Sequence, residues 1–414
     1  MSRRVAVVAL TALLVAGCSD DQSPPTAGPS TVPSSSVPVS TSEQPATPTD
    51  TPSQTPTPTP TPTATPNPPS CVDQKLQTLT LREQAAQLIM TGISANGMTS
   101  AQRPIVQQQK PGSILLLGTG GSLAHTRTAT AAASTAATVK GVRPLVAADQ
   151  EGGQIQRLKG SGFDRIPAAT TQGTWSADKL TARAKVWGQQ LKQAGVNVDL
   201  APVADVVPSS LKSQNAPIGS LDREYGNTPG EVGPPVQAFV QGMKQAGVMT
   251  SVKHFPGLGR VRGNTDFSSG VVDTVTVRRD ADLQPYADGI KAGTAMVMIS
   301  TVTYTKIDAK NRAVFSPTVI QGMVRGDLGW NGVVITDDVG AAAEVASVPA
   351  GQRATRFVAA GGDIVINATA ALTSTMVTAL VTKAQQDKAF AAKLASSVKR
   401  VLTLKQEHGL VSCG

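Results

Sequence analysis

The sequence contains few aromatic residues, histidines and cysteines, and these shortages exclude several kinds of protein. Phe, Trp and Tyr make up 3% of its 414 residues, and no run of five Lys or Arg residues occurs, so we expect no nucleic-acid partner. The 3 His and 3 Cys residues lack the spacing of metal ligands, so we expect no metal and no cofactor. No apolar run of about 18 residues follows the first 18 positions, which excludes a polytopic membrane protein.

Two common enzyme motifs are also missing. The chain has no Gly-x-Ser-x-Gly sequence, which marks the nucleophile of many serine hydrolases, and no Gly-x-Gly-x-x-Gly sequence that opens a helix after an early strand. What the chain has in excess is positive charge, with a formal net charge of +9. A basic body can be attracted to anionic polymers such as cell-wall glycans and phosphates, although a solvated basic surface explains the same composition.

Proline is concentrated in one segment, because 15 of the 29 prolines fall between residues 20 and 70. Such a Pro/Thr/Ser-rich segment cannot bury enough surface to offset the entropy of ordering, so residues 18–70 are expected to form a disordered, extended linker. Before it, residues 1–17 contain a basic head, an apolar stretch and small residues ahead of Cys18. They resemble a bacterial lipoprotein signal peptide, which implies cleavage before Cys18, a lipid on that residue and an extracytoplasmic location anchored to the cell membrane.

Two cysteines remain in the globular region, residues 71–414. Cys71 is the first residue of this region and Cys413 is its second-last. In an exported protein two remaining cysteines are expected to pair, so we predict a disulfide that joins the two ends of the domain. We expect this domain to be a monomer.

Short apolar runs alternate with amphipathic stretches throughout residues 71–414. Runs rich in Val, Ile and Leu are typical of strands buried on both faces of a parallel sheet, with helices as crossovers. Residues 177–194 and 316–328 show helical periodicity, the second with Ser316 as its N-cap. Eight apolar runs predict an α/β fold, a (β/α)8 TIM barrel, with a doubly wound open sheet as the alternative. The runs are residues 87–93, 114–118, 145–149, 196–202, 250–255, 296–301, 333–338 and 363–367.

Polar residues follow five of these runs. Because the C-terminal ends of the strands of a barrel meet at one mouth, these side chains are expected to line one pocket. Carboxylates dominate the set, and two carboxyl groups, one ionised and one protonated, are what cleavage of a glycosidic bond requires. The residues are Asp149, Asp205, Lys253 with His254, Ser300 with Thr301, and Asp337 with Asp338.

Five segments resemble, in order and spacing, those of glycoside hydrolase family 3, and most closely those of its single-barrel β-N-acetylglucosaminidases of peptidoglycan turnover. The resemblance covers nearly all of residues 71–414. It implies a retaining, exo-acting hydrolase that removes terminal β-linked N-acetylglucosamine from peptidoglycan fragments. A β-glucosidase or glycoside phosphorylase of the same fold, and a catalytically weak glycan-binding lipoprotein, stay open as alternatives. The segments are residues 148–157, 201–206, 222–226, 253–259 and 332–338.

The resemblance also implies roles for single carboxylates. Asp337 would be the nucleophile that attacks the anomeric carbon, because a carboxylate at the end of a buried strand is rigidly aimed. Asp338 beside it better fits a cap of the following helix. Asp149 would accept hydrogen bonds from sugar hydroxyls.

Three basic residues complete the substrate site that the resemblance implies. Lys253 and His254 would bind sugar hydroxyls, and Arg223 would bind the substrate near its acetamido group. For Arg223, a purely structural salt bridge to Asp222 or Glu224 is the alternative.

One loop departs from the family pattern. Where the family carries its general acid/base as an Asp-x-His dyad, residues 260–269 contain no histidine. Without a gap, Asn264 takes the Asp position and Asp266 the His position, whereas a two-residue insertion puts Asp266 and Ser268 there. We favour the ungapped alignment, and we predict that Asp266 is the general acid/base and that Asn264 orients its carboxyl by a hydrogen bond. A merely structural turn at Asp266 is the alternative.

Overall fold

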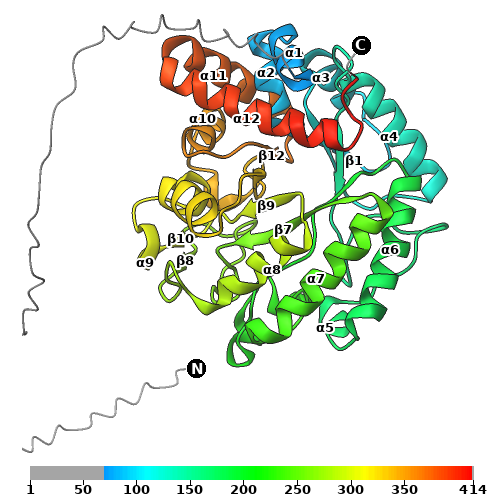
Figure 1. Cartoon of the computed structure of the whole chain (residues 1–414), viewed down its shortest axis with the longest axis vertical. Helices are drawn as coiled ribbons and strands as arrows, with labels where there is room; N and C mark the ends of the chain where they lie inside the picture. The colour runs from blue at the N-terminus through cyan, green and yellow to red at the C-terminus, as the bar shows by residue number, and fades with distance from the viewer. Residues whose placement is uncertain (1–69, 413–414) are drawn as a thin grey trace, which may run out of the picture. The chain divides into compact units, whose positions relative to one another are not determined.

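The computed structural model describes residues 70–412, and these residues form a closed α/β barrel with helices around it (Figure 1). Eight parallel strands follow the order β11-β9-β7-β6-β3-β2-β1-β12. A backbone bridge between Ile335 and Ile364 joins the two ends of this order. The predicted TIM barrel is therefore confirmed, and the open-sheet alternative is wrong. The strands are β1 (Ile89–Ser94), β2 (Ser113–Leu117), β3 (Leu145–Ala148), β6 (Val198–Asp199), β7 (Met249–Phe255), β9 (Met296–Ile299), β11 (Val333–Thr336) and β12 (Val365–Asn367).

Each barrel strand coincides with one of the eight apolar runs. All seven residues of β7 are buried, which is typical of a strand with side chains filling the barrel on one face and helices covering the other. Two small strand pairs lie outside the barrel sheet: β4 (Gln150–Gly152) with β5 (Ile155–Gln156), and β8 (Val272–Asp273) with β10 (Thr303–Tyr304).

Capping residues define where the outer helices begin and end. Before α7, the Thr228 hydroxyl accepts from the Glu231 N–H, and Pro229 occupies the first helical position. After α7, Gly247 has a φ of 75°, the left-handed conformation that ends many helices. The α-helices are α1 (Cys71–Thr78), α2 (Leu81–Gln87), α3 (Gln102–Gln109), α4 (Leu123–Ala137), α5 (Ala169–Gln172), α6 (Ala177–Gln193), α7 (Pro229–Ala246), α8 (Gln284–Ala292), α9 (Thr305–Asp308), α10 (Ala350–Ala359), α11 (Thr373–Gln386) and α12 (Lys388–Glu407).

The two helices predicted from periodicity are both present, but one differs in type. Residues 177–194 correspond to α6. Residues 316–328 contain a π-helix over Thr318–Asp327, and the Ser316 hydroxyl caps it by accepting from the Val319 N–H at 3.1 Å. Over ten residues, an apolar stripe does not distinguish hydrogen bonds to the fourth residue from bonds to the fifth, so the periodicity predicted the helix but not its type.

The two ends of the described chain lie beside the loop that precedes β3, at the N-terminal end of the barrel strands (Figure 1). Lys75 Nζ in α1 donates to the Lys140 carbonyl at 2.9 Å, and the Ser412 N–H donates to the Gly141 carbonyl at 3.0 Å. Among the described residues, no helix is both long enough and apolar enough to cross a membrane. The signal peptide, the linker with Cys18, and Cys413 lie outside the described residues.

Candidate active site

A cavity of about 560 Å³ opens among the C-terminal ends of the barrel strands. Its walls come from the turns after β3 and β11, from the end of β7 and from the loop after it. The structure thus brings together the six residues to which the sequence gave a role in catalysis or substrate binding, whereas Asp205, Ser300 and Thr301, also expected at this pocket, are not among its lining residues. The six residues are Asp149, Arg223, Lys253, His254, Asp266 and Asp337.

Asp337 and Asp338 follow β11 directly, and their carboxylates have different surroundings. The Asp337 N–H donates to the Ile299 carbonyl at 2.8 Å, and Asp337 Oδ1 accepts from the Asp338 N–H at 2.8 Å. Asp337 Oδ2 has no hydrogen-bond partner within residues 70–412. Asp338 does not cap a helix as predicted, because the next helical segment begins only at Ala343; its carboxylate instead accepts from three backbone N–H groups of the surrounding loops. These belong to Gly340, Ala341 and Ala368.

A buried ion-pair network forms one wall of the cavity. Lys253, which is 2% exposed, places Nζ 2.8 Å from Asp149 Oδ1 and 2.6 Å from Glu151 Oε1. Arg223 binds the other side of Glu151 in a bidentate pair, with Nε to Oε2 at 2.8 Å and Nη2 to Oε1 at 2.7 Å. Although burial opposes ionisation, Arg223 and Lys253 hold the pKa of Glu151 far below its usual value. Glu151 is therefore an ionised carboxylate held between two basic side chains.

Arg223 does not form the salt bridge that the sequence left open. Lys212 Nζ binds Asp222 at 2.9 Å and Glu224 at 2.6 Å, which leaves Glu151 as the carboxylate partner of Arg223. The alternative with Asp222 or Glu224 is therefore wrong. The sequence alone did not give Glu151 a role. A signal was available, because Glu151 stands two positions after Asp149 within residues 148–157, one of the segments that carry the family resemblance.

Asp205 contacts His254 and orients its ring. The sequence gave Asp205 no individual role. His254 Nδ1 lies 2.8 Å from Asp205 Oδ2. Asp205 Oδ1 accepts from the Leu258 N–H at 2.8 Å and from the Tyr286 hydroxyl at 2.7 Å. Burial opposes ionisation of Asp205, but His254 and these donors lower its pKa. An ionised Asp205 holds a proton on His254 Nδ1, and the other ring nitrogen, Nε2, lies 3.4 Å from Arg223 Nη2.

The loop without the family histidine reaches the same cavity. Asn264, Asp266 and Phe267 line the cavity, whereas Ser268 is not among its lining residues. Asn264 Oδ1 accepts from the Asp266 backbone N–H at 2.9 Å, so the prediction that Asn264 bonds the carboxyl is wrong. Asn264 fixes the backbone turn instead, as Asn commonly does by bonding the N–H two residues on. This placement favours the ungapped alignment.

The carboxyl groups of Asp266 and Asp337 both have raised pKa values. Burial and the negative charge of Asp337 raise the pKa of Asp266. Burial also raises the pKa of Asp337, but nearby His254 and Lys253 oppose that rise. Because two nearby carboxylates repel each other, ionisation of one group opposes ionisation of the other, and the two groups titrate as a pair.

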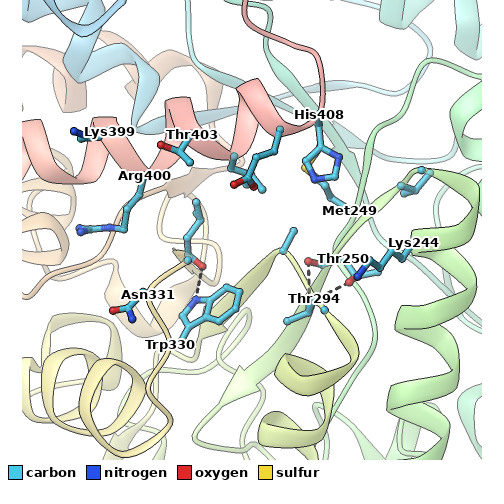
Figure 2. Close-up of a pocket in the computed structure, with 18 of the residues that line it drawn as sticks. Lys244, Met249, Thr250, Thr294, Trp330, Asn331, Lys399, Arg400, Thr403 and His408 are labelled. Atoms are coloured by element: carbon cyan, nitrogen blue, oxygen red, sulfur yellow. Dashed lines mark hydrogen bonds between the residues drawn. The ribbon is translucent and has the colours of Figure 1, made fainter. Parts of the chain in front are cut away.

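A second cavity, of about 640 Å³, lies at the opposite end of the barrel (Figure 2). It is formed by the N-terminal ends of β7, β9 and β11 and by α12, with Trp330 and His408 among its lining residues. Glu407 is its one acidic lining residue, so it does not offer a pair of carboxyl groups. Within residues 70–412, no group of three or more His, Cys, Asp or Glu side chains is placed to hold a metal ion.

Comparisons with known proteins agree with this geometry. Residues 80–404 match the glycosyl hydrolase family 3 N-terminal domain. The chain is 30% identical over 287 residues to a beta-hexosaminidase of Stenotrophomonas maltophilia, a match that spans 67% of this chain and 82% of the relative.

Solved structures give the same result. A beta-N-acetylhexosaminidase from Beutenbergia cavernae is 41% identical, with a TM-score of 0.78 over 79% of this chain and 99% of the other. A family 3 beta-N-acetylglucosaminidase from Paenibacillus is 26% identical, with a TM-score of 0.71 over 80% of this chain and 63% of the other. The chain therefore belongs to glycosyl hydrolase family 3, as a glycoside hydrolase of the β-N-acetylhexosaminidase type.

Proposed function

We propose that this protein is a retaining, exo-acting β-N-acetylglucosaminidase that removes terminal N-acetylglucosamine from peptidoglycan fragments. The observation that carries this proposal is the pair of carboxyl groups in one cavity, Asp337 and Asp266, where the negative charge of Asp337 raises the pKa of Asp266. A retaining glycosidase needs one carboxylate as nucleophile and one carboxylic acid as proton donor.

In the first step, the ionised Asp337 attacks the anomeric carbon while the bond to the leaving oxygen breaks. Asp266 gives its proton to that oxygen, which leaves a glycosyl ester on Asp337 and a carboxylate at Asp266. In the second step, Asp266 takes a proton from water as the water oxygen attacks the anomeric carbon. Asp337 is released as a carboxylate, and Asp266 is again protonated.

The ion-pair network supports binding of the terminal sugar. Lys253 and His254 donate to or accept from hydroxyls, and Asp149 accepts from hydroxyls with the oxygen that does not face Lys253. Arg223, held by Glu151, offers its guanidinium to the acetamido group. Phe267, next to Asp266 and 83% exposed, borders the space where the leaving group departs, because the acid contacts the leaving oxygen.

The proposal also includes a lipid anchor at Cys18 and a disulfide that joins the two ends of the domain. The lipoprotein-like segment ending at Cys18 would tether the enzyme outside the cytoplasm, near cell-wall fragments. A disulfide between Cys71 and Cys413 is supported by the position of their neighbours, since Lys75 and Ser412 both contact the loop before β3. Non-reducing peptide mapping that finds both thiols free, or unmodified soluble protein from intact cells, would contradict these two parts.

Rate measurements on aryl glycosides test the proposal directly. Aryl β-N-acetylglucosaminide should be hydrolysed much faster than aryl β-glucoside, and added phosphate should not appear in the product. A preference for glucoside or a sugar phosphate product would identify the alternative enzymes of this fold. A fluorosugar adduct should be found on Asp337 by mass spectrometry, and an adduct on another residue would refute the mechanism.

The proton donor is tested separately. Asp266→Asn should slow a disaccharide fragment by about 10²–10⁴-fold and largely spare attack on activated aryl substrates. Azide should restore turnover of aryl substrates by that variant, because azide needs no general base. An unchanged rate on the disaccharide would show that the proton comes from elsewhere.

A further inference from the structure

The loop that carries Asp266 is fastened to the segment that follows Asp337. The Thr265 carbonyl accepts from the Glu344 N–H at 3.1 Å, and the Asp266 carbonyl accepts from the Ala343 N–H at 3.2 Å. The backbone beneath the Asp266 carboxyl therefore rests on a turn that begins six residues after Asp337.

The side chain of Glu344 makes a third connection at the far end of the loop. Glu344 is 1% exposed, and its Oε2 accepts from the Val271 N–H at 2.8 Å. The Val271 carbonyl in turn accepts from the Thr303 N–H at 3.2 Å. Glu344 thus holds both the middle of the loop, through its backbone, and the end of the loop, through its carboxylate.

Arg312 supplies the charge that balances this buried carboxylate. Its Nε donates to Glu344 Oε1 at 2.7 Å, and its backbone forms a bridge with Thr303. A buried ion pair is no better for stability than a well-packed apolar pair, so its value here lies in the geometry that it enforces. Both oxygens of Glu344 are occupied, which leaves the loop little freedom to shift along the turn.

We propose that Glu344 is a positioning residue that keeps the Asp266 loop on the turn after Asp337 and thereby fixes the acid relative to the nucleophile. This inference rests on the proposed role of Asp266 in proton transfer. The carboxyl of Asp266 forms no hydrogen bond within residues 70–412, so its place depends on the backbone that Glu344 holds. A displacement of about 1 Å at a reacting group can cost about 100-fold in rate.

The test is Glu344→Gln, which preserves size but can accept only one of the two side-chain hydrogen bonds well. For a GlcNAc–MurNAc disaccharide, which needs the acid, kcat/KM should fall by about tenfold or more. For an activated aryl substrate, which does not need the acid, kcat/KM should change by less than about threefold. The alkaline limb of the disaccharide pH profile should move to lower pH, because Asp266 is then held less firmly beside the charge of Asp337.

Asp363→Asn is the matched control, since Asp363 is also a fully buried carboxylate held by arginines. It accepts from Arg325 and Arg400 at 2.8 Å and from the Val334 N–H at 2.8 Å, at the other end of the strands. This variant should lower Tm without changing the ratio of the two kcat/KM values or the alkaline limb.

Two outcomes with Glu344→Gln would overturn the inference: a wild-type ratio with a wild-type alkaline limb, or equal losses on both substrates. Asp266→Asn, measured in parallel, separates the two proposals. A normal disaccharide rate in Asp266→Asn would overturn the proposed acid, and the inference with it. An azide-rescued loss in Asp266→Asn together with a wild-type profile in Glu344→Gln would overturn the positioning role alone.

Discussion

Replacing Asp205 with Asn should lower kcat/KM for aryl β-N-acetylglucosaminide by roughly 10- to 100-fold. Asn retains an oxygen at the Oδ1 position, so the bonds from Leu258 and Tyr286 survive. Its amide NH₂ replaces Oδ2, the atom that lies 2.8 Å from His254 Nδ1. Two donors then face each other unless the imidazole moves its proton to Nε2, where it would point toward Arg223.

The magnitude follows from the bond that is lost. A hydrogen bond to a charged group contributes about 1.5–3 kcal/mol, and about 1.4 kcal/mol corresponds to a tenfold change in rate. The loss should appear in kcat/KM, because His254 contacts substrate both before and during the reaction in the proposed site. The fraction of Asp337 that a fluorosugar labels would give the fraction of correctly folded sites, so that kcat/KM can be compared per active site.

Tyr286→Phe is the control for this prediction. It removes one donor to Asp205 Oδ1 and leaves Oδ2 on His254 unchanged, so kcat/KM should stay within about threefold of wild type. An Asp205→Asn enzyme with wild-type kcat/KM would refute the claim that Asp205 sets the proton position on His254. Equal losses in the two variants would attribute the effect to packing instead.

Three further variants test other parts of the structure. Glu151→Gln leaves Arg223 and Lys253 without their shared carboxylate, so thermal denaturation should show a loss of about 3–5 kcal/mol, and KM should rise. Asp338→Asn replaces one carboxylate oxygen that accepts from a backbone N–H, so it should lower the free energy of unfolding by about 0.5–2 kcal/mol and keep measurable turnover. Asp337→Asn should have no measurable turnover. Burial lowers the pKa of Lys405 to about 7, so its contribution to wild-type stability should decline as pH falls from about 10.5 to 7, and Lys405→Met should lack this decline in Tm.

Residues at strand ends were predictable because the barrel itself brings them together. Asp149, Lys253, His254 and Asp337 lie at or directly after buried strands, so eight apolar runs and the rule that strand ends converge were enough to place them in one cavity. Their individual roles needed the family resemblance, because convergence alone does not distinguish Asp337 from Asp338.

Contacts between loops were not predictable in the same way. The sequence offered Asp222 and Glu224 as neighbours of Arg223, and only the position of Lys212 shows why Glu151 is its partner instead. Glu344 lies 73 residues from Val271, so their bond depends on how two irregular segments fold over each other. No periodicity in the sequence carries that information.

In the proposed anchored enzyme, the position of α1 would decide which end of the barrel the tether reaches. Lys75 in α1 and Ser412 both contact the loop before β3, at the end of the strands away from Asp337. If the chain is anchored through Cys18 as proposed, a pull on it would reach the barrel at α1, at the strand ends opposite the catalytic cavity. The attachment point of the proposed anchor and the catalytic cavity would then lie at opposite ends of the barrel, so the tether would leave the cavity open to substrate.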